Sequence, residues 1–189
     1  MTDLVSNASP RFKARITGVV YFLYFLTAIS ADVLIGPSRL AFFDAVNLIA
    51  EALYIAVTLL FFFMFRQVNR SLSLVAALCS LMGCANDVVN LFNHAPHRIN
   101  SLVFFGPYCL LLGYLIFMST FLPRILGVLM VLAGLGWLVF LTPLAIPLST
   151  YLKILGFLAE ASLMLWLIVK GVNEQRWNER ASARQASAA

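Results

Sequence analysis

The sequence predicts an all-α membrane protein, a bundle of six transmembrane helices, and two observations carry this prediction. Hydrophobic residues make up 62% of the 189-residue chain and charged residues only 11%, with a mean hydropathy of +0.93. A water-soluble fold of this size cannot bury so much apolar surface, whereas lipid can cover it. Six apolar stretches also come close to the roughly 20 residues that a helix needs to cross a bilayer. The six stretches are 16–35, 43–65, 72–92, 102–121, 125–146 and 151–169.

Short connections join the six stretches, so consecutive helices are expected to be antiparallel neighbours. The pattern Arg-Ile-x-Gly opens the first stretch at 15–18 and the fifth at 124–127, and Arg70 precedes the third at near-equal spacing. This regularity suggests a two-helix hairpin used three times, as internal repeats are common in transporters. Hairpins of equal length would give the same spacing without any duplication.

Basic residues collect on one side of the predicted membrane. Ten of the thirteen Lys and Arg residues lie before, between or after the helices on the side of the termini, and three lie on the other side. By the positive-inside rule, both termini face the cytoplasm, in the inner membrane of a bacterium. Residues 1–14 then form a cytoplasmic segment, 15–172 the transmembrane domain, and 173–189 a cytoplasmic, disordered tail. The ten are Arg11, Lys13, Arg15, Arg66, Arg70, Arg124, Lys170, Arg176, Arg180 and Arg184, and the three are Arg39, Arg98 and Lys153.

The net charge of +5 does not indicate nucleic acid as a partner, because the basic residues follow the membrane pattern. The expected partner is membrane lipid, together with a small-molecule, lipid or cation ligand. The sequence carries no signal for the oligomeric state.

Two glutamates interrupt the apolar stretches, and each stands in an Ala-Glu-Ala triplet. A rise of 1.5 Å per residue places Glu51 and Glu160 roughly 12 to 14 Å from the outer surface, near the bilayer midplane. No Lys or Arg is expected at that depth, and burial favours the neutral carboxyl form. If the two groups lie close together, they are expected to share one proton.

Polar residues recur at helical spacing on three of the predicted helices. The second helix carries such a stripe, the third repeats the pattern, and the sixth shows Ser149, Lys153, Gly156 and Glu160. Polar stripes avoid lipid, so they are expected to meet inside the bundle and form a polar cavity that opens outward. Besides the two glutamates, the candidate ligand-binding residues are Asp32, Asp44, Asn47, Tyr54, Asn86, Asp87 and Asn90.

A metal site is a weaker hypothesis. His94 and His97 lie near acidic residues, but Pro96 separates them in a segment expected to form a turn, so they need not share a face. No phosphate-binding loop, nucleophile elbow or zinc-protease motif is present in the sequence. We therefore expect no metal and no cofactor.

Several functions fit these features. The favoured interpretation is binding or transport of a small molecule or cation coupled to protonation of Glu51 and Glu160. A membrane-embedded enzyme could instead use either glutamic acid as a general acid on a lipid or isoprenoid. A scaffold or partner subunit, in which the glutamates only join helices, is a third interpretation. We favour a function other than catalysis, because no catalytic motif supports an enzyme.

Four segments resemble a known protein family. Residues 14–21, 66–72, 113–115 and 122–129, the last including Pro123-Arg124-Ile125, are similar to the bacterial domain-of-unknown-function family DUF4386. The resemblance implies a six-helix, polytopic bacterial membrane protein. It implies no particular activity.

Overall fold

The computed structural model describes residues 9–31, 33, 40–93 and 100–186, and within these ranges it is mostly helical, with short turns between the helices. Six helices are long and apolar enough to cross a membrane, which confirms the predicted fold class. The candidates Asp32, His94 and His97 lie outside the described residues. The six helices are α2 (Pro10–Ser30), α3 (Leu40–Phe65), α4 (Arg70–Asn93), α5 (Leu102–Ser119), α6 (Arg124–Leu138) and α7 (Ala145–Val169).

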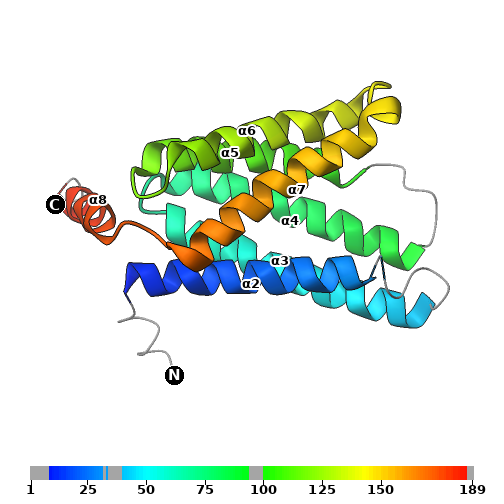
Figure 1. Cartoon of the computed structure of the whole chain (residues 1–189), viewed down its shortest axis with the longest axis horizontal. Coiled ribbons are helices and arrows are strands. Elements are labelled where there is room, and N and C mark those ends of the chain that lie inside the picture. The colour runs from blue at the N-terminus through cyan, green and yellow to red at the C-terminus, as the bar shows by residue number, and fades with distance from the viewer. Residues whose placement is uncertain (1–8, 32, 34–39, 94–99, 187–189) are drawn as a thin grey trace.

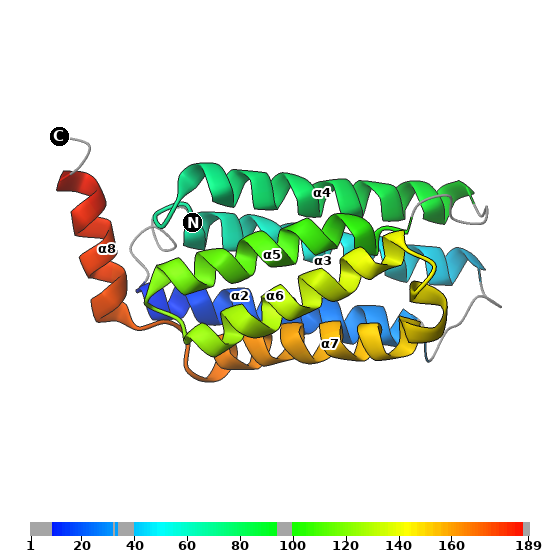
Figure 2. The ribbon, with the colours of Figure 1, turned by 90° about the horizontal axis from the view of Figure 1, so that it is seen from above.

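The six helices form a closed ring. Each helix packs against the next one in the chain, and α7 packs against α2 to complete the circle (Figure 1). Because six helices alternate in direction, α2 begins and α7 ends at the same end of the bundle (Figures 1 and 2). The core between them is mostly aromatic and aliphatic, with Phe61, Leu112 and Leu163 among its most buried side chains.

Local sequence signals set several helix ends. The Ser9 hydroxyl accepts a hydrogen bond from the Phe12 N–H at 3.2 Å, and Pro10 follows at the first helical position, where its missing N–H costs nothing. The Asn69 side chain caps α4 in the same way through the Leu72 N–H at 3.0 Å. Gly171 ends α7 with φ of +69°, a conformation that favours glycine.

The turn between α6 and α7 comes earlier than the sequence predicted. After α6, the 3₁₀ helix η3 (Val139–Leu141) leads to Pro143, and α7 starts at Ala145 rather than near residue 151. Pro147 lies in the first turn of α7, where an N–H has no partner within the helix. Proline therefore begins this helix instead of interrupting it.

Glycines hold α5 and α6 at close range. A Cβ built on Gly113 would lie 2.7 Å from the Gly127 carbonyl oxygen, and one on Gly127 would lie 2.8 Å from the Gly113 carbonyl. Gly106 of α5 and Gly134 of α6 make the same reciprocal contact about two helical turns away. These four glycines give α5 and α6 small faces that let the two backbones touch.

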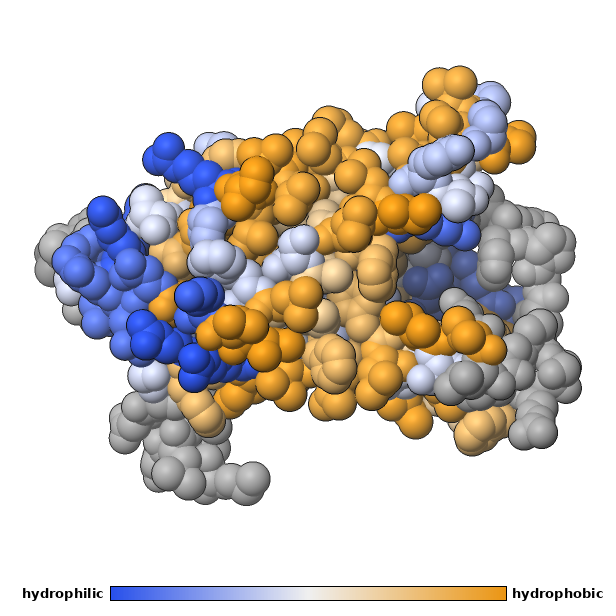
Figure 3. Space-filling model, in the orientation of Figure 1, coloured by the Kyte–Doolittle hydropathy of each residue, from blue (hydrophilic) through white to orange (hydrophobic). Residues whose placement is uncertain are grey.

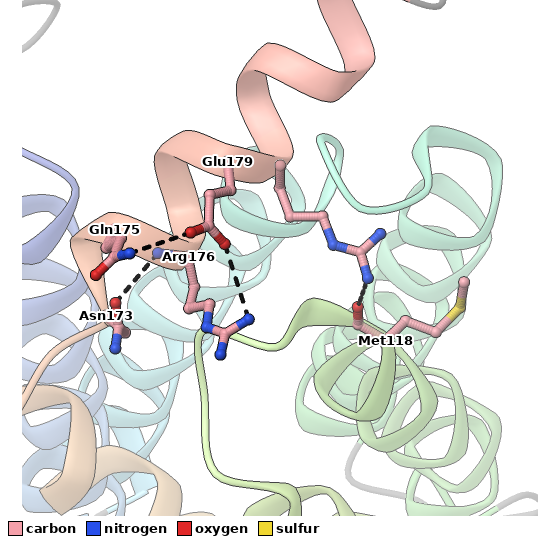
Figure 4. A network of polar contacts seen from close by, with 6 residues as sticks. Met118, Asn173, Gln175, Arg176 and Glu179 are labelled. Atoms are coloured by element: carbon pink, nitrogen blue, oxygen red, sulfur yellow. Dashed lines mark hydrogen bonds and ion pairs between the residues drawn. The ribbon is translucent and has the colours of Figure 1, made fainter.

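The end of the chain forms a helix where we expected a disordered tail. Helix α8 (Glu174–Ala186) lies crosswise at the end of the bundle (Figure 2). The Asn173 side chain caps it by accepting the Arg176 N–H at 3.1 Å (Figure 4), and the Trp177 ring packs on Phe121 with centroids 4.9 Å apart. The Arg180 guanidinium donates to the Met118 carbonyl at 2.5 Å. The tail has too few apolar residues for a periodic pattern, so one tryptophan and these polar contacts hold it in place.

The surface agrees with a membrane setting. Figure 3 shows an apolar belt around the middle of the molecule and hydrophilic residues at the α8 end. At the opposite end it shows a hollow with hydrophilic residues in its depth. This is the end where α3 begins and α4 finishes.

Candidate functional site

Glu160 lies in the middle of α7 and points into the bundle. Its side chain is only 9% exposed, and the Tyr21 hydroxyl of α2 donates a hydrogen bond of 2.5 Å to its Oε2. Hydrogen bonds to a carboxyl group are among the stronger ones in proteins, particularly where water is excluded. This contact joins two helices that are far apart in the sequence.

A cluster of tyrosines surrounds Glu160. The Tyr21 and Tyr54 rings meet edge to face with centroids 6.1 Å apart, and Tyr24 lies 4.6 Å from Tyr54. Tyr108 of α5 reaches the cluster from the other side, 6.4 Å from Tyr54. The phenol groups of Tyr21, Tyr54 and Tyr108 all interact electrostatically with Glu160. One acid and several phenols thus form a buried polar group at the centre of the bundle.

Glu51 has different neighbours. It is half-buried on α3, and its carboxyl group faces the Cys84 thiol and the Asp87 carboxyl of α4. Its Oε2 atom is buried without a hydrogen-bond partner. A buried acceptor left without a donor is costly unless a proton, water or ion satisfies it.

The two glutamates lie at different levels. The Tyr21 ring lies between Tyr54 and Phe61 of α3, with ring centroids 6.1 and 5.9 Å apart. Because Glu160 is hydrogen-bonded to Tyr21, it lies at about the level of the middle of that pair. Glu51 stands about six residues further toward the end of the bundle opposite α8, which is roughly 9 to 10 Å along the axis. Tyr24 interacts electrostatically with both carboxyl groups. The single shared pocket expected from the sequence stays a prediction, and the geometry describes two neighbouring polar groups linked by Tyr24.

The other predicted residues on α3 and α4 lie toward the end of the bundle opposite α8. The Asn47 amide donates to the Phe43 carbonyl of its own helix at 2.9 Å, so this donor is satisfied locally. The Asn86 amide donates to the Ser101 hydroxyl at 2.6 Å and ties α4 to the start of α5. Asp44 and Asn90 are half-buried. The end of the molecule that carries these residues is the one with the polar hollow in Figure 3.

The predicted stripe on α7 is not a continuous polar face. Lys153 is exposed, and Gly156 is covered by the Trp137 ring, whose nearest atom would lie 2.0 Å from an added Cβ. Of the four stripe residues, Glu160 alone is a buried polar side chain. The predicted polar stripe includes Gly156, but the absence of a side chain at this position provides room for the Trp137 ring.

Sequence reasoning missed Tyr21, Tyr24 and Tyr108. A signal was present in Tyr21 and Tyr24, which stand three residues apart and therefore share a helix face. Tyr108 had no such signal, and its side chain is only 2% exposed. Cys84 and Ser101 were also missed, because a small side chain in an apolar helix indicates packing rather than a site.

The described residues contain no group of three His, Cys, Asp or Glu side chains arranged to hold a metal ion. His94 and His97 are outside these residues, so their role stays a prediction. The carboxyl groups of Glu51 and Asp87 can instead share a proton or accept a singly charged ligand.

Comparison with known proteins gives a family but no activity. Residues 99–171, which cover α5 to α7 and include Glu160, match the model of a domain of unknown function, DUF4386. An uncharacterized protein of Archaeoglobus fulgidus is 28% identical over 131 residues, which is 62% of this chain and 76% of that protein. No solved structure shows a significant match.

Proposed function

We propose that this chain, which belongs to the DUF4386 family, binds a small cation at Glu51 and Asp87 and exchanges it for a proton. The observation that carries the proposal is the half-buried Glu51 side chain, whose buried Oε2 atom has no hydrogen-bond partner and whose carboxyl group faces a second carboxyl group from the next helix. In this proposal Glu160 is a second protonation site, deeper in the bundle.

The physical argument concerns two like charges in one place. Two neighbouring carboxylates in a poorly solvated site repel each other, so a bound proton or a cation between them stabilises the pair. Protonation and cation binding then exclude one another. This competition is the basis of proton-coupled transport, and intramembrane acids commonly mark such sites.

The setting of the site supports an outward opening. Glu51 and Asp87 lie in the half of the bundle opposite α8, and the hollow of Figure 3 is at that end. We propose that the α8 end faces the cytoplasm of a bacterial cell, because ten of thirteen basic residues belong to that side. A cation would then enter from outside the inner membrane.

The enzyme alternative has less support. A lipid or isoprenoid would have to reach the Glu160 carboxyl, which is enclosed by Tyr21, Tyr54 and Tyr108, each at most 4% exposed. These rings would have to separate before any substrate could bind. The scaffold interpretation explains the hydrogen bond between Tyr21 and Glu160, but it gives no reason for the unpartnered oxygen of Glu51.

The experiment is cation-driven proton movement in proteoliposomes. A sodium or tetramethylammonium gradient is imposed, and a pH-sensitive dye reports proton movement in the opposite direction. We expect this signal to disappear in Glu51→Gln and Asp87→Asn, and to persist in Glu174→Gln, which changes an acid on α8 outside the bundle. Full proton movement in Glu51→Gln would contradict the proposal.

A further inference from the structure

Buried hydroxyl groups continue from the centre of the bundle toward the α8 end. Thr58 Oγ1 and Ser80 Oγ lie 2.7 Å apart and join α3 to α4, and both side chains are at most 1% exposed. The Tyr108 hydroxyl of α5 interacts with Thr58. Three helices therefore contribute to one hydroxyl group cluster that the proposed cation site does not use.

This cluster adjoins Glu160 on one side. Tyr108 interacts electrostatically with the Glu160 carboxyl as well as with Thr58. Because Tyr21 and Tyr54 belong to the same group, the carboxyl proton has phenol oxygens around it. Tyr108 is thus the group that Glu160 and Thr58 share, and the Thr58–Ser80 hydrogen bond extends the cluster to α4.

A small cavity adjoins the cluster on the other side. Its volume is about 10 Å³, the size of about one water molecule, and its lining is largely apolar, with Thr58, Ser73 and Tyr108 as the lining residues that carry a hydroxyl group. Ser73, in the first turn of α4, also lines it and donates to the Phe62 carbonyl at 3.2 Å. The polar groups therefore extend from the centre of the bundle to the turn of α4 nearest the α8 end.

We propose that Tyr108, Thr58 and Ser80 form a proton path that connects Glu160 to water at the α8 end. This inference rests on the proposed function, in which Glu160 exchanges protons. Each hydroxyl oxygen accepts a proton on one side and releases its own on the other, so only O–H bonds form and break. A water in the cavity completes the transfer toward Ser73.

Packing alone is a poor explanation for this arrangement. Two apolar side chains at positions 58 and 80 would fill the same space without the cost of burying hydroxyl groups. A gap beside them also forfeits packing energy in an otherwise close-packed core. A polar pair next to a water-sized space suits proton transfer.

The experiment measures hydrogen–deuterium exchange of the Glu160 carboxyl by infrared spectroscopy. The protein is brought to a pH acidic enough to show the neutral carboxyl band, which is assigned by its loss in Glu160→Gln, and is then transferred to D₂O. We expect Thr58→Val to slow exchange of this band at least tenfold. Ser80→Ala should also slow exchange of the Glu160 band, and this variant provides the test if Thr58→Val does not fold.

The controls distinguish loss of the proton path from an effect on the cation site and from a general loosening of the helix bundle. Ser162→Ala changes an exposed hydroxyl on the same helix as Glu160 and should leave the rate unchanged. The Glu51 band, assigned with Glu51→Gln, should keep its rate in Thr58→Val, because Glu51 lies in the half of the bundle opposite α8 and away from Thr58. A variant that merely loosens the bundle would exchange faster.

Two results would overturn the path. One is an unchanged or faster Glu160 rate in both Thr58→Val and Ser80→Ala. The other is a Glu160 carboxyl that does not exchange in the unchanged protein. Neither result depends on a cation, so the proton path can be disproved without disproving the cation site. The cation site is tested separately, by the cation-driven proton movement in proteoliposomes.

Discussion

Glu51 and Glu160 are the same residue type at similar expected depths, yet their surroundings differ. Glu160 has a donor in Tyr21 and is packed among rings, whereas Glu51 faces a thiol and another acid. A carboxyl with a hydrogen-bond donor is satisfied by the protein itself. One with an unpartnered oxygen has room for an exchangeable ligand, which is why we assign the cation to Glu51.

Removing the Tyr21 hydroxyl tests the residue-scale account of Glu160. Tyr21→Phe leaves the carboxyl buried without its donor, so we expect a loss of about 1–3 kcal/mol in the free energy of unfolding. Tyr114→Phe is the matched control, because this tyrosine is 51% exposed, and it should change stability by less than about 0.5 kcal/mol. Unfolding of both variants in the same detergent gives the comparison. Equal effects would show that the hydrogen bond contributes little.

At the scale of elements, glycine decides how α5 and α6 pack. Gly113→Ala would place a Cβ 2.7 Å from the Gly127 carbonyl oxygen, so the helices must separate, and we expect a loss of about 1–3 kcal/mol. Gly136 provides the control on α6, since its Cβ would meet atoms no closer than 3.4 Å. Gly136→Ala should be neutral or stabilising, because alanine favours a helix by up to about 1 kcal/mol. A stability ranking in the opposite order would argue against the close approach of these helices.

The docking of α8 is a second property of elements. Asn173→Ala removes the side-chain cap of α8 but keeps the backbone hydrogen bond from Asn173 to the Phe121 carbonyl. Loss of a cap costs about 1 kcal/mol, so amide exchange in residues 174–180 should become about fivefold faster. Mass spectrometry of exchanged peptides measures this, with Gln175→Ala as the control. If Gln175→Ala accelerates exchange as much as Asn173→Ala, the cap does not hold the helix.

At the scale of the whole molecule, the distribution of charge predicts its orientation. Thr150 and Ser182 are both exposed and lie at opposite ends of the bundle. A maleimide that cannot cross membranes should label Thr150→Cys in intact cells, and Ser182→Cys only after the cells are opened. Cys84 and Cys109 are buried, which limits background labelling from these two positions. Labelling of Ser182→Cys in intact cells would reverse the proposed orientation.

The sequence was sufficient for most of the architecture. Hydrophobic length predicts each spanning helix because lipid imposes it. Helix α8 could not be found in this way, since Trp177 and a few polar contacts hold it and none of these forms a periodic pattern. The sequence predicted the start of the last spanning helix near residue 151 and not at Ala145, because the effect of Pro147 depends on whether it begins or interrupts a helix.

The candidate site was predicted only in part. Glu51 and Glu160 stood out because charge is rare in apolar stretches, but their neighbours depend on how the ring of helices closes. The contact of Tyr21 with Glu160 joins the first and last spanning helices, and no local pattern records it. The partnership of Glu51 with Cys84 and Asp87 likewise depends on the rotation of α3 against α4, which hydrophobic periodicity sets only approximately.

The most direct test of the account is competition between protons and cations at Glu51. A membrane-permeant carbodiimide reacts with neutral carboxyl groups, and mass spectrometry locates the adducts. The account predicts that Glu51 is modified at acidic pH and that sodium or tetramethylammonium suppresses this modification. It also predicts that Asp87→Asn weakens the suppression, because half of the cation site is lost. Modification of Glu51 that depends on neither pH nor either cation would contradict the central claim.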